Sequence, residues 1–184
     1  MQKIKNKIFQ LILRLMRWKI NGSLPKNKQY IIAAAPHTSN WDFIIAVFLR
    51  GALGEKISFL GKSQLFKPPW GWFFSAMGGK PVDRTKSNNL VDSVIDIFTN
   101  NPSFKLALAP EGTRSAVTKW KTGFYYIAKG AKIPIVLTGL DFKKRTLFIS
   151  NAIYPGNDIK KDMNLIIDFF RGIDGKHPKK IPSF

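Results

Sequence analysis

The most restrictive feature of this sequence is a short apolar run, Tyr30 to Ala35, which stops at Pro36. Apolar residues occupy every position of the run, whereas a strand with one solvent-exposed face alternates apolar and polar residues. The run therefore predicts a strand that is buried on both sides, within a sheet that carries helices on both faces.

The rest of the chain alternates between the patterns of strands and helices. Apolar residues at helical spacing predict helices at 42–53, 88–100, 122–129 and 163–170. Short apolar runs predict further strands at 57–60, 80–82, 104–109, 133–140 and 146–149. A chain of 184 residues suits one domain with a substantial core. We predict a single α/β domain over residues 29–184, in which helices flank a largely parallel central sheet.

The first twenty residues, which contain no acidic residue, predict an additional amphipathic helix. One face is apolar and consists of Ile4, Ile8, Leu11, Ile12, Leu15 and Trp18. Another face is basic and consists of Lys3, Lys7, Arg14 and Arg17. This pattern is typical of a helix in the headgroup plane of a membrane, although a surface helix packed on its own domain is an alternative. The one-sided charge and Trp18 favour a membrane-surface helix over residues 1–20.

The overall charge points to anionic partners. The chain has 30 Lys and Arg residues against 11 Asp and Glu residues, a formal charge of +19. Such an excess favours nucleic acid, anionic lipid headgroups, phosphorylated cofactors or an acidic carrier protein. No cysteine is present, which excludes disulfides, thiolate nucleophiles and cysteine metal sites. No run of about 18 apolar residues exists, so a conventional membrane span is not expected.

The segment HTSNWD, residues 37–42, follows the apolar strand and contains one of the two histidines. Residues five apart on one helix point about 140° apart, so His37 and Asp42 meet only if His37 precedes a helix that Asp42 begins. Asp42 would then fix the tautomer of His37 and leave the other ring nitrogen free to accept a proton from a hydroxyl. The alternative is a histidine bonded to a nearby carbonyl, with Asp42 as an ordinary acid at a helix start.

Two further polar loops follow predicted strands. In GKPVDR, residues 79–84, Arg84 offers a planar fork that suits a phosphate or carboxylate, or else pairs with a nearby aspartate. In PEGTRS, residues 110–115, Glu111 can accept a hydrogen bond from a substrate hydroxyl, and N–H groups around Gly112 can stabilise developing negative charge. The alternative for this loop is a tight turn with a helix-capping threonine.

The segment KPPWGWFFSAMGG, residues 67–79, is too rich in large apolar side chains for a solvated loop. These side chains can line a path for an acyl chain or touch a bilayer. The alternative is an ordinary core element, because apolar clusters are usually buried.

Together these segments resemble the lysophospholipid (1-acylglycerol-3-phosphate) acyltransferase family, also called the PlsC-like family. HTSNWD is similar to its block of a histidine, four residues and an aspartate, GGKPVDR to its glycine-to-arginine block, and PEGTRS to its third block. IPIVLTG, residues 133–139, is similar to its fourth block, and all four occur in the family's order. The chain departs from many members at Pro81 and at Leu137-Thr138, and it is shorter than many of them.

The resemblance implies transfer of a fatty acyl group from acyl-CoA or acyl-carrier protein to a hydroxyl of a lysophospholipid-like acceptor, with 1-acylglycerol-3-phosphate favoured. By analogy, His37 is the general base and Asp42 its partner, and no covalent acyl-enzyme forms. Arg84 would bind the acceptor phosphate, and Arg114 is a further anion-binding candidate. The loop residues expected to shape the acceptor site are Glu111, Gly112 and Thr113. We expect neither a cofactor nor a metal, and a peripheral or monotopic location on the cytoplasmic face of a membrane that contains anionic lipids.

The sequence is also compatible with other functions. The acceptor can be a different lipid-like molecule, or the chain can be a catalytically silent relative that binds lipid without turning over a thioester. A basic nucleic-acid-binding domain is also compatible with the charge and with aromatic residues among lysines. Because the basic residues are dispersed, nucleic acid is not the expected partner.

Overall fold

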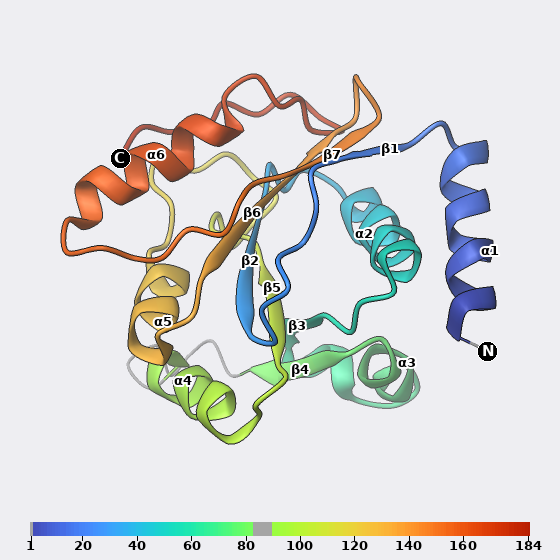
Figure 1. Cartoon of the computed structure of the whole chain (residues 1–184), viewed down its shortest axis with the longest axis horizontal. Helices are drawn as coiled ribbons and strands as arrows, with labels where there is room; N and C mark the ends of the chain where they lie inside the picture. The colour runs from blue at the N-terminus through green and yellow to red at the C-terminus, as the bar shows by residue number, and fades with distance from the viewer. Residues whose placement is uncertain (1, 83–89) are drawn as a thin grey trace.

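The computed structural model describes residues 2–82 and 90–184 and confirms the predicted α/β domain (Figure 1). In the described ranges, seven strands form one sheet in the order β1-β7-β6-β2-β5-β3-β4. The strands are β1 (Lys19–Asn21), β2 (Tyr30–Ala35), β3 (Ser58–Lys62), β4 (Gly79–Val82), β5 (Lys105–Leu108), β6 (Ile135–Asp141) and β7 (Thr146–Ile149). Neighbouring strands are parallel except for the antiparallel pair β6 and β7.

Helices cover both faces of this sheet, as the apolar strand predicts. The helices are α1 (Gln2–Leu15), α2 (Asn40–Leu53), α3 (Gly71–Ala76), α4 (Leu90–Asn100), α5 (Gly123–Ala131) and α6 (Ile159–Phe170), with a short 3-10 helix η1 (Ser63–Phe66). Figure 1 shows α4, α5 and α6 on one side of the sheet and α1 and α2 on the other. The predicted helices and strands are therefore all present within the described residues, with shifts of a few residues at their ends. Residues 88 and 89 of the predicted helix 88–100 lie outside the described ranges.

Strand β2 lies at the centre of the sheet, between β5 and β6. Ile31 and Ala33 belong to the core beneath α4, α5 and α6, whereas Tyr30 and Ile32 belong to the core beneath α1 and α2. Successive strand residues point to opposite faces, so a strand covered on both faces needs apolar residues at every position. Full burial of each large apolar side chain stabilises the fold by about 1.5–3 kcal/mol, which explains the continuous run.

The N-terminal helix is shorter than the predicted range 1–20. Helix α1 ends at Leu15, and the chain then turns through Arg17, whose φ is 59°. Residues Lys19–Asn21 form β1 beside β7. Trp18 is buried, and its ring meets that of Phe142 edge to face at 5.2 Å. Trp18 therefore belongs to the core of the domain and not to the exposed helix face that the sequence suggested.

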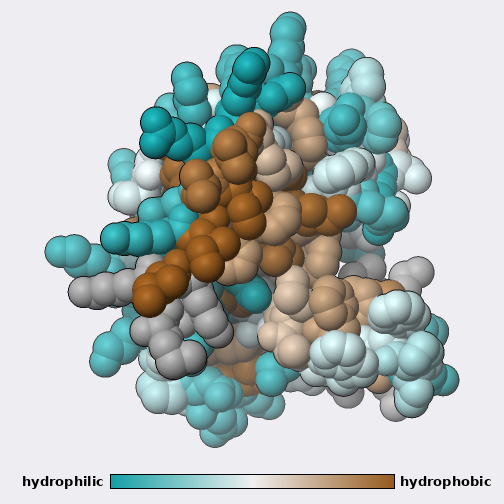
Figure 2. Space-filling model, turned by 90° about the vertical axis from the view of Figure 1, so that its right-hand side faces the viewer, coloured by the Kyte–Doolittle hydropathy of each residue, from teal (hydrophilic) through white to brown (hydrophobic). Residues whose placement is uncertain are grey.

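Helix α1 has two apolar faces with different surroundings. One packs on α2, where the Phe9 and Phe48 rings lie 6.2 Å apart and a Cβ at Gly51 would lie 2.4 Å from the Phe9 ring. The other face is exposed and forms the apolar band in Figure 2; its exposed residues are Ile4, Ile8, Leu11 and Leu15. The helix is thus docked on its own domain and still presents an apolar surface. Within the described residues, no helix has the length and apolar character needed to cross a membrane.

The aromatic segment at residues 67–79 is also divided between the interior and the surface. Phe74 packs in an aromatic cluster with Phe43 and Phe66, at ring distances of 6.5 and 6.4 Å. Trp70 and Trp72 are 66% and 72% exposed. Phe74 therefore fits the interpretation as a core element, whereas the exposed Trp70 and Trp72 fit the interpretation as an apolar contact surface.

Candidate active site

The site lies where β2 and β5 end side by side. These strands are parallel neighbours, with Ala33 opposite Leu108, so the loops that follow them leave the same edge of the sheet. HTSNWD follows β2 and PEGTRS follows β5. The loops are joined directly, because the backbone N–H of His37 donates to Oε1 of Glu111 at 3.0 Å.

The predicted contact between His37 and Asp42 is present. His37 Nδ1 lies 2.9 Å from Asp42 Oδ2. His37 lies in the turn between β2 and α2, and Ser39 caps the helix that begins at Asn40. Asp42 is the third residue of that helix and completes a capping box with Ser39. The bend of the chain thus brings together two side chains that a continuous helix would separate.

Asp42 serves as helix cap and histidine partner at once. Its Oδ2 accepts the backbone N–H groups of Thr38 and Ser39 at 2.7 and 2.8 Å, in addition to the His37 ring. The residue is only 6% exposed. Three donors therefore converge on one oxygen at the N-terminal end of α2 and fix the position of this side chain.

The histidine ring is therefore held in one tautomer. A carboxylate oxygen only accepts hydrogen bonds, so Nδ1 of His37 carries the ring proton and Nε2 presents its lone pair. The His37 side chain is 29% exposed, and Nε2 has no hydrogen-bond partner among the described residues. A ring nitrogen that is free, accessible and backed by a carboxylate can accept a proton from a bound hydroxyl.

The PEGTRS loop places its residues in two environments. Glu111 is buried, and its Oε2 forms an ion pair with Lys179 while Oε1 accepts from His37. Gly112 has a φ of 67° and donates its N–H to the Ala109 carbonyl in a tight turn. The exposed residues Thr113 and Arg114 have backbone N–H groups without a partner in the described ranges. Substrate contacts by these residues stay predictions, and Arg84 lies outside the described residues.

Sequence reasoning missed Lys179, which follows α6 at a separation of 142 residues from His37. Its ammonium donates to the carbonyls of His37 and Thr113 at 3.0 and 3.2 Å, besides pairing with Glu111. Burial lowers the pKa of Lys179, and the negative charge of Asp42 acts against this shift. Lys179 is one of several lysines after α6, and no local pattern distinguishes it from its neighbours.

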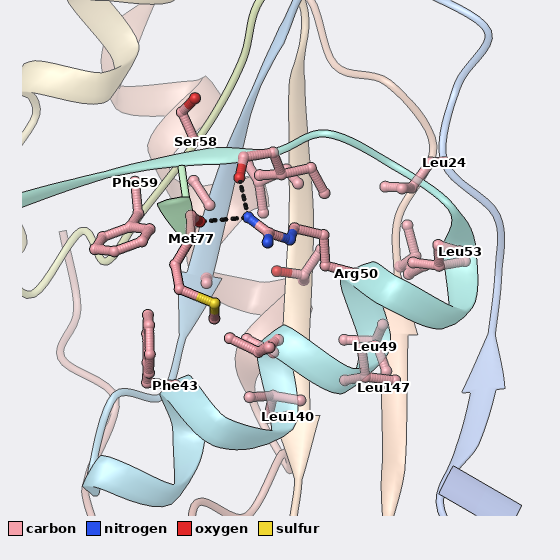
Figure 3. Close-up of a pocket in the computed structure, with 18 residues that line it drawn as sticks. Leu24, Phe43, Leu49, Arg50, Leu53, Ser58, Phe59, Met77, Leu140 and Leu147 are labelled. Carbon is pink, nitrogen blue, oxygen red and sulfur yellow. Dashed lines mark hydrogen bonds between the residues drawn. The ribbon is translucent and has the colours of Figure 1, made fainter. Parts of the chain in front are cut away.

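An apolar cavity of about 140 Å³ lies between α2 and the sheet (Figure 3). Phe43, which directly follows Asp42, lines it, as do Val47 and Arg50 further along the same face of α2. Arg50 lies seven positions after Phe43, about 10 Å along the helix. Arg50 donates to the carbonyls of Ile57 and Met77 at 2.9 and 2.6 Å, and burial lowers its pKa.

The fold and this site define an α/β domain with a histidine–aspartate pair at the end of its central parallel strand. The family model described as acyltransferase matches residues 17–138, which is more than half of the chain. The chain therefore belongs to the acyltransferase family.

The relatives agree with this assignment. The chain is 30% identical over 148 residues to the 1-acyl-sn-glycerol-3-phosphate acyltransferase of Saccharomyces cerevisiae, covering 73% of this chain and 47% of the yeast protein. It is 35% identical over 107 residues to the epsilon form of that enzyme from Mus musculus, covering 54% of this chain and 29% of the mouse protein. The chain thus spans about half of the yeast relative and less than a third of the mouse relative.

A solved structure shares the fold. It is the crystal structure of the 1-acyl-sn-glycerophosphate acyltransferase PlsC from Thermotoga maritima, with a TM-score of 0.64 and 18% sequence identity. The match covers 94% of this chain and 78% of the Thermotoga chain. At this identity the likeness supports the arrangement of the sheet and helices.

The dual role of Asp42 predicts a stability effect that is separable from the histidine. Asp42→Ala leaves the buried N–H groups of Thr38 and Ser39 without an acceptor, and should lower the free energy of unfolding by about 1–3 kcal/mol. His37→Ala keeps the cap and should unfold close to wild type in urea. Equal losses in the two variants would contradict a cap that is independent of the ring.

Proposed function

We propose that this protein transfers a fatty acyl group from an acyl thioester to a hydroxyl of a lysophospholipid-like acceptor. The observation that carries the proposal is the His37–Asp42 pair, whose second ring nitrogen has no partner within the described residues. Phe43, the residue after Asp42, lines an apolar cavity, and the chain belongs to the acyltransferase family. The yeast and mouse relatives are named 1-acyl-sn-glycerol-3-phosphate acyltransferases, so we favour 1-acylglycerol-3-phosphate as the acceptor.

The proposed reaction needs one base and no covalent intermediate. Nε2 of His37 takes the proton of the acceptor hydroxyl while the oxygen attacks the thioester carbonyl. The tetrahedral oxyanion then collapses, the C–S bond breaks, and the leaving thiolate takes the proton back from the imidazolium. Asp42 holds the ring and stabilises its positive charge between these two steps. The N–H groups of Thr113 and Arg114, which have no partner among residues 2–82 and 90–184, are candidates to stabilise the oxyanion.

The acceptor phosphate needs cationic partners close to the base. Arg114 is exposed at the end of the PEGTRS turn, and its guanidinium can bind a phosphate through two hydrogen bonds. Arg84 stays a second candidate for this role. A formal charge of +19 suits the phosphates of acyl-CoA and the acidic surface of acyl-carrier protein equally, so both remain proposed donors.

The cavity under α2 is proposed to receive the acyl chain. Apart from Arg50, Ser58 and Thr138, its lining residues are apolar. An acyl chain that enters past Phe43 would run along Val47 toward Arg50, away from the histidine. The thioester carbonyl would then remain near His37 while the chain is removed from water.

The exposed face of α1 is proposed to hold the enzyme on a membrane. Leu11 and Leu15 are 57% and 75% exposed on that face, although the same helix is docked on the domain through its other side. Lys7 and Arg14 are available to anionic headgroups, and Trp72 on α3 offers a second apolar contact. Such a peripheral location would bring the enzyme to lysolipid that is already in the bilayer.

The central prediction concerns His37. Purified protein is mixed with acyl-CoA or acyl-carrier-protein thioester and a panel of lysolipids, and release of free thiol is followed. We expect acceptor-dependent release that falls by about 10²–10⁴-fold in His37→Ala, because the base is lost. His177→Ala, which alters the other histidine, is the matched control and should retain the rate. Equal rates in wild type and His37→Ala would contradict the mechanism.

A substitution within the cavity tests the acyl path. Val47→Phe fills part of the space between α2 and the sheet, and should lower kcat/KM for long-chain thioesters about tenfold more than for short-chain ones. Ile44→Phe adds the same ring outside the cavity and should not change the preference. If Val47→Phe reduces the rates for all chain lengths equally, the acyl chain does not lie in this cavity.

Binding to vesicles tests the surface of α1. The double variant Leu11→Ser/Leu15→Ser should weaken sedimentation with anionic vesicles about tenfold or more, because two exposed leucines no longer enter the bilayer. Leu165→Ser changes an exposed leucine on α6, on the other side of the sheet, and serves as control. Unchanged sedimentation of the double variant would rule out α1 as the anchor.

A further inference from the structure

Lys179 is bound to the two loops of the site through its whole ammonium group. Its three partners are the carbonyl of His37 at 3.0 Å, the carbonyl of Thr113 at 3.2 Å, and the carboxylate of Glu111. The side chain of Lys179 is 4% exposed and that of Glu111 is fully buried. A lysine ammonium has three N–H donors, so this set of partners uses all of them.

These contacts close a ring around the backbone of His37. Its N–H donates to Oε1 of Glu111, the other oxygen of Glu111 pairs with Lys179, and Lys179 donates to the carbonyl of His37. The N–H and the carbonyl lie on opposite sides of the His37 Cα, so rotation about either φ or ψ would break one of these bonds. The Asp42 contact fixes the imidazole, whereas the ring of contacts fixes the backbone from which it projects.

The segment that carries Lys179 lies along the same turn at two further points. A Cβ added at Gly175 would lie 2.6 Å from the Thr38 side chain, and the N–H of His177 donates to Thr38 Oγ1 at 3.3 Å. Ile181, two residues beyond Lys179, packs on the core beneath α4, α5 and α6. Lys179 is thus placed by contacts on both sides in the sequence, and its position does not depend on the ion pair alone.

We propose that Lys179 is a positioning residue for the acyl transfer, acting with Glu111 to hold the His37 backbone in register with the reacting hydroxyl. The inference rests on the function proposed above. In this arrangement Glu111 acts through His37, because both of its carboxylate oxygens are already engaged. Misplacing a catalytic group by about 1 Å can lower a rate about 100-fold. Loss of the ring of contacts around the His37 backbone, which we call the clamp, should therefore lower the rate.

The Lys179–Glu111 ion pair also affects folding, and the experiment has to separate its effect on stability from its effect on the rate. Lys179→Met alone leaves the buried Glu111 carboxylate without its counter-ion, which destabilises a fold strongly. The double variant Glu111→Gln/Lys179→Met removes both charges and keeps an acceptor for the His37 N–H. It still lacks the donor to the His37 carbonyl, so it should fold without restoring the clamp.

The test compares the wild type, the double variant, Lys179→Arg and the neighbouring exposed control Lys180→Met. We expect the double variant to unfold near the wild-type temperature with kcat lowered about 10- to 100-fold and KM for the thioester little changed. Lys179→Arg should recover most of the rate, and Lys180→Met should match wild type. Wild-type kcat in a folded double variant would overturn the proposal, because the pair would then be merely structural.

A second readout keeps this proposal distinct from the proposed function. Hydrogen exchange of the His37 amide reports the bond to Glu111 without any substrate. We expect slow exchange in wild type and Lys180→Met and faster exchange in the folded double variant, with the amides of β2 as the reference for global unfolding. If the wild type releases no thiol, the acyltransferase function fails; if the His37 amide exchanges equally fast in all three proteins, the clamp fails.

Discussion

The arrangement of this site depends on one carboxylate oxygen, Oδ2 of Asp42. It accepts the backbone N–H groups of Thr38 and Ser39, just before α2, and the ring N–H of His37. The same atom therefore stabilises the turn after β2, caps the start of α2, and fixes the tautomer of the histidine. Because the cap and the His–Asp pair share this atom, correct folding of the turn and correct orientation of the proposed base are a single event.

The layers of the domain place this turn among the other parts that acyl transfer needs. The central position of β2 puts the turn beside the loop after β5, so Glu111 meets the His37 backbone. Helix α2 leads from the turn along the apolar cavity, and α1 packs on α2 with its outer face exposed. The proposed membrane contact, the proposed acyl cavity and the proposed base thus follow one another over two packed helices.

Much of this arrangement is predictable from sequence because it is local. The unbroken apolar run of β2 indicates burial on both faces, and the spacing of His37 and Asp42 permits contact only across a strand–helix turn. The end of α1 is harder to predict from the sequence. Arg17 adopts a left-handed φ at a position where no glycine indicates a turn, and Trp18 then enters the core. The exposed apolar face of α1 follows from the helical spacing, whereas its second, docked face depends on the close approach of Gly51.

Lys179 was beyond sequence reasoning for a different reason. Its contacts join positions 142, 68 and 66 residues apart, and a lysine among lysines after the last helix carries no spacing signal. The burial of Glu111 was equally hidden, because PEGTRS reads as an exposed polar turn and only the neighbouring loop and Lys179 enclose its carboxylate. Contacts between distant loops are set by the packing of the sheet, which a local pattern does not encode.

The proposed mechanism requires one tautomer of the His37 ring, which the ¹⁵N spectrum of the imidazole reports directly. The chain has only two histidines, so ¹⁵N-labelled protein gives two ring systems, and the His37→Ala variant assigns them. We predict that neutral His37 is held as the Nδ1–H tautomer with an unprotonated Nε2, and that Asp42→Asn disturbs this state while His177 is unaffected. A His37 ring that carries its proton on Nε2, or that averages between tautomers as an exposed histidine does, would contradict the proposed base.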